Sequence, residues 1–412
     1  MRARYLLLLI AALLYVLLPA SSVFALNVKN SGKISQAAAS LRSVGNQILL
    51  PSGKAFIPEG ISVYGGLEDT DYMENIPNIM AQIKAAVIYW HTNTIRLQVA
   101  ESNLFANVTP GKSYNVKFLN LLVKLVDYAR SLNQAVVIND QTEFTTNMGG
   151  PTAITARFWR VIGDKFANKP FVIFDLFNEP REGSISGKSV PVLTKSYSHF
   201  QILRLLIRRH SNRKVRINSN LSWQIWKYGG ELNGIKYIGM QELVNQIRYR
   251  GISNLIWVEG PDWAYVLPKN KNLLSGDNIE YSFHHINLNR LSSWLVVGKL
   301  AKIRPVVDGE WSQYQSPWEE CFVSSPTTVP KYLAYLKAHN VGLVAWSLQP
   351  GSLLKGIPGN IPANNNSPRD TKKASNMREP SRFSRDYACN NHFGQGAGAL
   401  IKQYFINNAQ PL

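Results

Sequence analysis

Short apolar runs alternate with longer segments of helical periodicity along most of the chain after residue 45. Residues 116–132 have apolar side chains such as Phe118, Leu122 and Leu125 at the spacing of a helix that is buried on one face. Residues 171–177 are short, apolar and rich in β-branched and aromatic side chains, which is typical of a buried strand. This alternation of strands and helices predicts a parallel α/β fold.

The pattern predicts eight strands, which is the number in a closed (β/α)8 TIM barrel. Residues 48–57 predict a hairpin before the first strand, and helices are expected over 76–89, 116–132 and 154–166. In such a barrel the chemistry lies where the strands end and the following loops begin. The expected strands are Gly60–Tyr64, Asn93–Val99, Ala135–Asn139, Phe171–Phe177, Asn254–Val258, Tyr281–His284, Pro305–Val307 and Leu343–Trp346.

The N-terminus has the features of a secretory signal peptide. Arg2 and Arg4 precede an apolar run over residues 5–18, and small residues precede a cleavage site after Ala25. We therefore expect residues 1–25 to be removed and the protein to be secreted. The alternative is an uncleaved membrane anchor, because the run is close to the shortest length that spans a bilayer. We expect no stable membrane insertion after cleavage.

The rest of the chain predicts a single catalytic domain. A chain of 412 residues is too long for one small domain and suits one large barrel. We expect an N-terminal extension over residues 26–45 and a barrel over 46–412. Residues 184–222 and 355–385 do not fit the repeat and are interpreted as insertions. We expect the protein to be a monomer.

The charge of the chain is strongly positive, with 45 Lys and Arg against 26 Asp and Glu. Nucleic acid, anionic wall polymers and a merely solvated surface are the three interpretations. The basic residues are dispersed, and their densest cluster, over 204–216, lacks the interleaved aromatic residues of a single-strand binding groove. We expect no nucleic-acid partner, whereas binding of anionic wall polymers to the basic surface stays open. A hydrophobic content of 45% excludes an intrinsically disordered chain.

The two cysteines, Cys321 and Cys389, exclude a disulfide-dense scaffold. Export through an oxidising compartment favours a disulfide between them, and two free thiols are the alternative. The sequence has no Cys-x-x-Cys or His-Glu-x-x-His motif, so it predicts no metal site. The glycine-rich residues 394–398 follow no predicted strand and do not indicate a phosphate loop. We expect no cofactor.

Two glutamates follow predicted strands in contexts that suggest catalysis. The fourth strand runs into Asn178-Glu179-Pro180, and the seventh runs into Gly309-Glu310-Trp311. Strands of one barrel end at the same face, so both carboxyl groups are expected to border the central pocket. Glycoside hydrolysis uses such a pair, one as a general acid and one as an ionised carboxylate. Taken singly, each glutamate is also compatible with a solvated surface charge.

With these motifs the chain, from about Ile48 to Tyr404, resembles glycoside hydrolase family 5, the cellulase family, in its secreted bacterial form. The resemblance implies a (β/α)8 barrel and a retaining endo-β-1,4-glycosidase that forms a covalent glycosyl-enzyme. It implies Glu179 as the acid/base and Glu310 as the nucleophile. Further matches are Thr94-Ile95-Arg96, Gly239-Met240-Gln241-Glu242-Leu243-Val244, Trp257-Val258-Glu259-Gly260, Tyr281-Ser282-Phe283-His284 and Trp346.

The resemblance also implies roles for substrate-binding residues. Arg96 would hydrogen-bond Glu310 and keep it ionised, which agrees with the effect of a neighbouring positive charge. Asn178 would bind the sugar 2-hydroxyl. His284 would line the cleavage subsite, and Trp346 would stack against the sugar. Both His284 and Trp346 have the alternative interpretation of ordinary core residues.

Two positions depart from the family pattern. At the third strand Gln141 stands where the family usually has a histidine, and we include it among the substrate-binding candidates. At the sixth strand the usual His-x-Tyr reads His284-His285-Ile286, so the tyrosine that helps to hold the nucleophile is missing. Tyr281 and Tyr314 are the candidate replacements. These departures predict reduced or redirected activity as one outcome.

We expect a polysaccharide substrate, with cellulose or another β-1,4-glucan as the first choice. The alternatives are a β-mannanase, which would use the same two glutamates, and a catalytically weak carbohydrate-binding surface protein. A β-glucan cleft needs flat aromatic side chains, and Trp263 after the fifth strand is a second substrate-binding candidate. The full set of candidates is Trp346, Trp311, Trp263, Trp223 and Trp226. For Trp223 and Trp226, an anchor of the inserted segment is an equal alternative.

Overall fold

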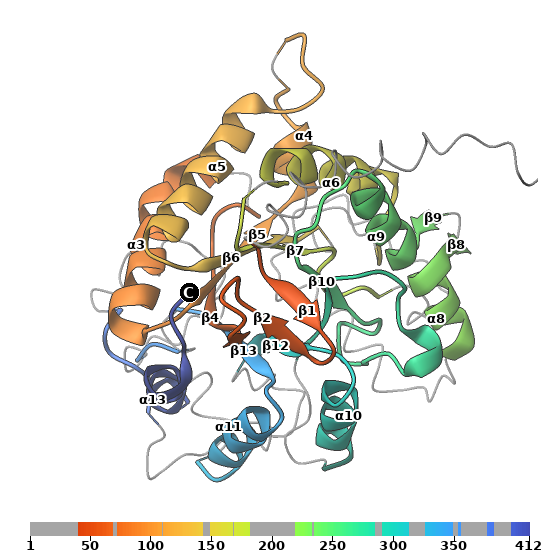
Figure 1. Cartoon of the computed structure of the whole chain (residues 1–412). Coiled ribbons are helices and arrows are strands. Elements are labelled where there is room, and N and C mark those ends of the chain that lie inside the picture. Colours follow the sequence, from red (N-terminus) through yellow and green to blue (C-terminus); the bar gives the residue numbers. More distant parts are fainter. Residues whose placement is uncertain are drawn as a thin grey trace, which may run out of the picture. The chain divides into compact units, whose positions relative to one another are not determined.

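Eight parallel strands form a closed barrel that is surrounded by helices (Figure 1). The ring closes where Leu343 pairs with Glu59 and Val344 with Gly60. The (β/α)8 TIM barrel predicted from the sequence is therefore confirmed. The strands are β4 (Glu59–Val63), β5 (Thr94–Val99), β6 (Ala135–Asp140), β7 (Val172–Asp175), β10 (Ile256–Glu259), β11 (Ile279–His284), β12 (Val306–Ser312) and β13 (Gly342–Trp346).

The computed structural model describes residues 40–68, 72–108, 110–142, 149–167, 169–181, 219–232, 235–284, 291–312, 326–348, 353–355, 377–382 and 397–412. The expected signal peptide, most of both insertions, His285, Ile286, Tyr314 and both cysteines lie outside these residues, so what we expect of them stays a prediction. Among the helices of the described residues, none combines the length and the apolar character of a membrane span.

The helices between the strands begin and end where the sequence provides caps. Asn115 accepts a hydrogen bond from the backbone N–H of Phe118 and caps α5. Thr152 and Thr155 form a capping box at the start of α6. The helices are α3 (Tyr72–Trp90), α4 (Glu101–Phe105), α5 (Val116–Ser131), α6 (Ala153–Phe166), α8 (Ser219–Tyr228), α9 (Met240–Tyr249), α10 (Leu291–Ala301), α11 (Thr328–Ala338) and α13 (Gly398–Asn408), with a hairpin of β8 (Gly229–Leu232) and β9 (Ile235–Ile238) between α8 and α9.

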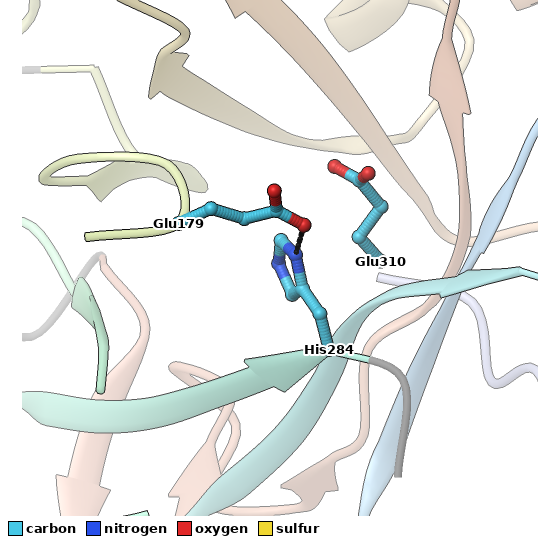
Figure 2. Close-up of side chains that lie close together, drawn as sticks. All are labelled: Glu179, His284 and Glu310. Carbon is cyan, nitrogen blue, oxygen red and sulfur yellow. Dashed lines mark hydrogen bonds and ion pairs between the residues drawn. The ribbon is translucent and has the colours of Figure 1, made fainter. Parts of the chain in front are cut away.

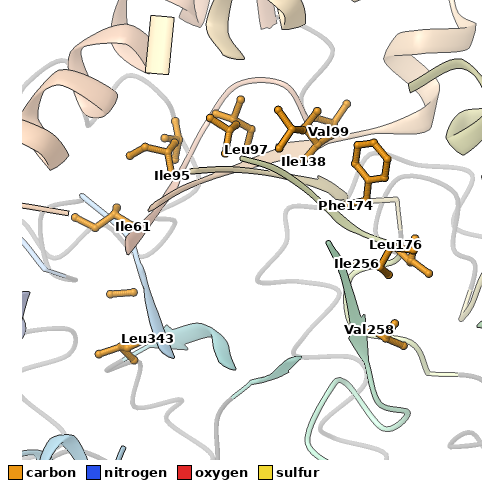
Figure 3. Packing of buried hydrophobic residues seen from close by; sticks show 14 of the residues in the cluster. Ile61, Ile95, Leu97, Val99, Ile138, Phe174, Leu176, Ile256, Val258 and Leu343 are labelled. Atoms are coloured by element: carbon orange, nitrogen blue, oxygen red, sulfur yellow. The ribbon is translucent and has the colours of Figure 1, made fainter. Parts of the chain in front are cut away.

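Alternation along each strand separates the outer core from the barrel interior. In β5, Ile95 and Leu97 face the surrounding helices, where they join one large apolar cluster (Figure 3). Arg96 between them is fully buried and faces the interior, where it contacts Glu310 and Asp175. The two-residue period of a strand is thus the reason that one short segment supplies both core and site.

The barrel interior near the N-terminal ends of the strands contains an apolar cluster, which packs against a small separate sheet. Side chains near the strand starts, such as Ala135 and Val307, form one cluster with Ile48 and Phe56. Ile48 and Phe56 come from the antiparallel sheet of β1 (Arg42–Val44), β2 (Gln47–Leu49) and β3 (Ala55–Phe56), which contains the predicted hairpin. The polar side chains around Arg96 lie farther along the strands, toward their C-terminal ends.

Strand β12 is longer than the sequence predicts, so that Glu310 lies within the strand instead of after it. The apolar run ends at Val307, but pairing continues to Ser312 because Asp308 is buried and accepts a 2.5 Å hydrogen bond from the hydroxyl of Tyr332. A register shift follows Asp308, and Glu310 lies opposite His284. A bulge in a barrel strand thus points Glu310 toward the interior.

Candidate active site

Arg96 is the centre of a polar cluster at the C-terminal end of the barrel. Its side chain is fully buried, and its guanidinium contacts Asp175 Oδ2 at 3.0 Å, Glu310 Oε2 at 2.5 Å, Asn178 Oδ1 at 2.6 Å and Glu259 Oε1 at 3.2 Å. Burial opposes the charge of Arg96, but the surrounding carboxylates outweigh it and raise its pKa. Arg96 is therefore a fixed positive charge beside Glu310.

Glu179, His284 and Glu310 meet in the centre of this cluster. Figure 2 shows the two glutamate side chains pointing toward one another, with His284 hydrogen-bonded to Glu179. One oxygen of each carboxyl group and a ring nitrogen of His284 all lie within 4.8 Å of one another. Both glutamates are 8% exposed, so their carboxyl groups are largely shielded from water.

His284 lies between two carboxyl groups. Its Nδ1 is 3.0 Å from Glu179 Oε1, and its Nε2 is 3.1 Å from Glu259 Oε1. Burial lowers the pKa of His284, but Glu259, Glu310 and the hydrogen bond to Glu179 outweigh burial and raise the pKa well above its ordinary value. The neighbouring carboxyl groups therefore favour the imidazolium form of the ring.

Asp175 and Glu259 belong to the cluster although the sequence analysis did not assign them a role. Burial and the neighbouring Glu259 raise the pKa of Asp175 to about 8, against the opposite effect of Arg96. Asp175 also accepts a 2.9 Å hydrogen bond from Asn139. A charged residue inside an otherwise apolar strand, as in Phe174-Asp175, is a sequence signal that could have identified it.

The candidate residue Gln141 contacts the cluster through a second glutamine. Gln98 Nε2 donates to Gln141 Oε1 at 2.8 Å and lies 3.4 Å from Glu310 Oε2. Gln98 is the next inward-facing residue of β5 after Arg96. The two-residue period of the strand could therefore have predicted that it faces the site. The pair of glutamines thus borders Glu310 on the side of β5 and β6.

A family model described as Cellulase (glycosyl hydrolase family 5) matches residues 52–287, which is more than half of the chain. The chain belongs to glycosyl hydrolase family 5. It is therefore a glycoside hydrolase. The match includes Arg96, Asn178, Glu179 and His284, whereas Glu310 lies beyond it. The comparison with curated proteins found no significant match.

Solved structures of this family have the same fold as the chain. The catalytic domain of the Thermobifida fusca endoglucanase Cel5A in complex with cellotetraose is 13% identical, with a TM-score of 0.52, over 91% of this chain and 99% of that chain. A β-glucanase from Saccharophagus degradans in complex with cellotetraose is 16% identical, with a TM-score of 0.53, over 90% of this chain and 94% of that chain. At such identities the likeness concerns the fold alone.

Five of the residues predicted from the sequence form one connected group in this family 5 barrel. Arg96 joins Glu310 to Asn178, and His284 joins Glu179 to the same group through Glu259. They come from β5, the loop after β7, β11 and β12, which lie far apart in the sequence. Closure of the barrel is what brings them together.

Trp346 and Trp263 are half-buried at the ends of two strands. Trp346 is the last residue of β13, and its ring packs edge-on against Tyr64 at 5.3 Å. The backbone N–H of Trp263 donates to Pro180 O at 3.1 Å, next to Glu179, and the guanidinium of Arg181 lies 4.4 Å from the Trp263 ring centre. Trp263 thus adjoins the loop that carries Glu179, and Trp346 packs at the end of β4.

Three other tryptophans that were candidates for a substrate cleft pack in or against the hydrophobic core. Trp311 is 2% exposed, so the prediction that it lines the cleft is wrong, and Trp226 is fully buried, which favours its alternative role as an anchor of the inserted segment. Their sequence positions near strand and helix ends did not reveal that both face the outer core. Trp223 is partly buried and packs edge-on against Trp226 at 5.1 Å, so it anchors α8.

The cluster of Glu179, His284 and Glu310 has the donor atoms and the spacing of a small metal site. Its donors are already engaged, because Glu310 contacts Arg96 and Glu179 contacts His284. A divalent cation would also face the permanent charge of Arg96 at close range, which opposes its binding. The residues fit acid–base chemistry better than metal ligation.

Proposed function

We propose that the protein is a retaining endo-β-1,4-glycosidase that hydrolyses β-1,4-glucan. The observation that carries the proposal is the short separation of Glu179 and Glu310, with carboxyl oxygens within 4.8 Å of each other. In inverting enzymes the two carboxyl groups lie about 6.5–9.5 Å apart to accommodate a water, whereas about 5–5.5 Å is typical of retention. The observed separation supports direct attack on the sugar.

In the first step Glu310 acts as the nucleophile. Its carboxylate forms a bond to the anomeric carbon while the glycosidic C–O bond breaks, and Glu179 gives its proton to the departing oxygen. The sugar becomes a glycosyl ester of Glu310, and Glu179 becomes a carboxylate. Arg96, 2.5 Å from Glu310, keeps the nucleophile ionised before attack.

In the second step Glu179 acts as a base. It takes a proton from a water molecule, and the water oxygen attacks the anomeric carbon from the side that the leaving group has vacated. The ester bond to Glu310 breaks, which regenerates the carboxylate and releases the sugar with its original anomeric configuration. Asn178 is held by Arg96 at 2.6 Å and would bind the sugar 2-hydroxyl.

A glucan is the first choice because the Thermobifida and Saccharophagus structures described above are complexes with cellotetraose. Release of reducing sugars from soluble β-glucan and β-mannan tests the choice. Proton NMR of the first product identifies retention, because a retaining enzyme releases the β-anomer before mutarotation. Faster hydrolysis of mannan would make the protein a β-mannanase, and early release of the α-anomer would contradict the retaining mechanism.

A catalytically weak carbohydrate-binding protein is the outcome if neither polymer is hydrolysed and the protein is pulled down by insoluble cellulose. We also propose that the protein is secreted, which the charged residues Arg2 and Arg4 and the apolar run after them support. N-terminal sequencing of the exported protein would test cleavage after Ala25.

A further inference from the structure

Glu259 is a third glutamate in the site, and among the described residues it accepts hydrogen bonds from the Glu179 backbone and Arg96 and lies within ion-pair distance of His284. It is the last residue of β10 and is fully buried. Its Oε2 accepts a 2.6 Å hydrogen bond from the backbone N–H of Glu179. Its Oε1 lies 3.2 Å from Arg96 Nη2 and 3.1 Å from His284 Nε2. Glu259 therefore touches the supports of both proposed catalytic glutamates.

We propose that Glu259 is a positioning residue that holds Glu179 and His284 in the arrangement needed for proton transfer, an inference that rests on the proposed function. The backbone of Glu179 is left-handed, with φ at 47°, a conformation that is strained in a residue with a side chain. The hydrogen bond from its N–H to Glu259 stabilises this conformation and directs the side chain toward Glu310.

The backbone of Glu259 is itself held in place. Its carbonyl oxygen accepts a 2.7 Å hydrogen bond from the indole of the buried Trp226. Trp263, which follows β10, donates its backbone N–H to the carbonyl oxygen of Pro180, which follows β7, at 3.1 Å. These contacts fix β10 and the loop after β7 relative to each other, so a change at Glu259 acts directly on Glu179.

Glu259 also determines which ring nitrogens of His284 carry protons. Nε2 faces Glu259, and Nδ1 faces Glu179, so each nitrogen donates toward a carboxyl oxygen. Other charged or titratable groups that interact with the ring come from β7 and β12. They are Asp175, Asp308 and Glu310.

A carboxylate suits this position better than an amide. Glu259 receives donors from Arg96, His284 and the Glu179 backbone, and an ionised carboxylate is purely an acceptor. In Glu259→Gln one carboxylate oxygen is replaced by an NH2 group, which is itself a donor. In either orientation of the amide, the NH2 group points toward a donor of the site instead of accepting from it. The variant keeps the size of the side chain and changes only the hydrogen-bonding pattern, so it tests positioning rather than packing.

The test compares two substrates in Glu259→Gln and in wild-type protein. Cellotetraose has a poor leaving group and needs the proton of Glu179, whereas dinitrophenyl β-cellobioside has a leaving group that needs no acid. We expect kcat/KM for cellotetraose to fall about 10²-fold, the effect of a misplaced catalytic group. For the dinitrophenyl substrate kcat/KM should fall much less, because Arg96 keeps its contacts with Asp175 and Glu310 and the bond to Glu310 still forms.

Glu280→Gln is the matched control. Glu280 is a buried glutamate of the neighbouring strand β11, and it accepts a 2.6 Å hydrogen bond from the indole of Trp257. It lies outside the cluster around Arg96, so both kcat/KM values should remain at the wild-type level. An equal loss on both substrates in Glu259→Gln would overturn the proposal, because the effect would then not pass through Glu179.

Nitrogen NMR of the histidine rings adds a measurement on the wild-type protein, in which a variant serves only to assign the signal. In wild-type protein both ring nitrogens of His284 should carry protons at pH 7, identified by the signal that is missing in His284→Gln. A neutral His284 ring at pH 7 would overturn the proposal. The failure of the proposed function looks different: wild-type protein would then hydrolyse neither substrate while His284 kept both protons.

Discussion

Gln98 Nε2 lies 3.4 Å from Glu310 Oε2, the same carboxylate oxygen that receives the 2.5 Å contact from Arg96. The side chain of Gln98 is 1% exposed, and its amide also donates to Gln141 at 2.8 Å. The family pattern implies a tyrosine near the nucleophile, and this chain has Ile286 at the matching position. Gln98 thus provides the proposed nucleophile Glu310 with a second donor.

Gln98→Leu should lower kcat/KM about tenfold, which corresponds to the loss of about 1.4 kcal/mol from one hydrogen bond to a charged group. The loss should be similar for cellotetraose and for dinitrophenyl β-cellobioside, because Glu310 attacks both. Gln134→Leu is the control: Gln134 is a buried glutamine that exchanges hydrogen bonds with Thr92 outside the site. It should reduce thermal stability and leave kcat/KM unchanged.

Replacement of each proposed catalytic glutamate should give a different defect. Glu310→Ala should abolish turnover because no carboxylate remains to form the glycosyl ester. Glu179→Ala should retain the first step on dinitrophenyl β-cellobioside and stall at the ester. Azide needs no general base, so it should restore turnover of this variant and yield a β-glycosyl azide, which NMR identifies.

Rescue of Glu310→Ala with formation of an α-glycosyl azide is expected for a retaining nucleophile, because azide then enters from the side of the missing carboxylate. If Glu179→Ala gave the α-azide and Glu310→Ala gave the β-azide, the roles assigned to Glu179 and Glu310 would be reversed. The absence of rescue in both variants would contradict the covalent mechanism.

The barrel could be predicted from the sequence because its signal is local. Apolar runs such as residues 171–177 and the periodic helix over 116–132 are visible in short windows. The boundaries were less accurate: β7 spans Val172–Asp175, and it begins after Phe171 because that residue has a φ of 63°, which is incompatible with an extended strand. Strand β12 passed beyond the predicted end because a buried tyrosine bonds Asp308, a contact that no local pattern reveals.

The candidate site was only partly predictable. Glu179 and Glu310 follow recognisable strand ends, and Arg96 lies within a short motif. Glu259 lies within the motif Trp257-Val258-Glu259-Gly260, but its role depends on the groups that three other strands or loops bring to it. The environment of a buried tryptophan is equally non-local, so the sequence left Trp226 open between the cleft and an anchor of the inserted segment, whereas it lies in the core.

Two tryptophans should differ in their effect on kinetics. Trp346 ends β13 next to β12, the strand that carries Glu310, so it is expected to stack against the sugar in the cleavage subsite. Trp346→Ala should lower kcat strongly, because distortion of that sugar supplies part of the transition-state stabilisation. Steady-state kinetics on cellotetraose measures the effect, and circular dichroism checks the fold.

Trp263→Ala should instead raise KM and leave kcat nearly unchanged, which is the signature of lost uniform binding. The ring of Trp263 is supported by Arg181 at 4.4 Å and is half-buried, so it suits a binding platform beside the cleavage point. Unchanged kinetics with a lower melting temperature in both tryptophan variants would show that these rings belong to the core and that the cleft lies elsewhere.

Glu280 should make the protein less stable as pH rises. Burial raises the pKa of Glu280 from 4.5 to about 8, although the hydrogen bond from Trp257 opposes the shift. Between these two pH values the unfolded chain has released the proton and the folded protein still holds it, so rising pH favours unfolding. The group contributes a slope of about −1.4 kcal/mol per pH unit to the free energy of unfolding across that window.

Glu280→Gln removes this titration and keeps an oxygen that can accept from Trp257. Urea denaturation of wild-type protein and variant at several pH values between 5 and 8 measures the difference, in which the contributions of all other groups cancel. We expect the variant to gain stability relative to wild type with each step in pH. If the difference in the free energy of unfolding stayed constant across the window, Glu280 would have the same pKa in the folded and unfolded chains. Its burial would then not raise its pKa, and the prediction would be wrong.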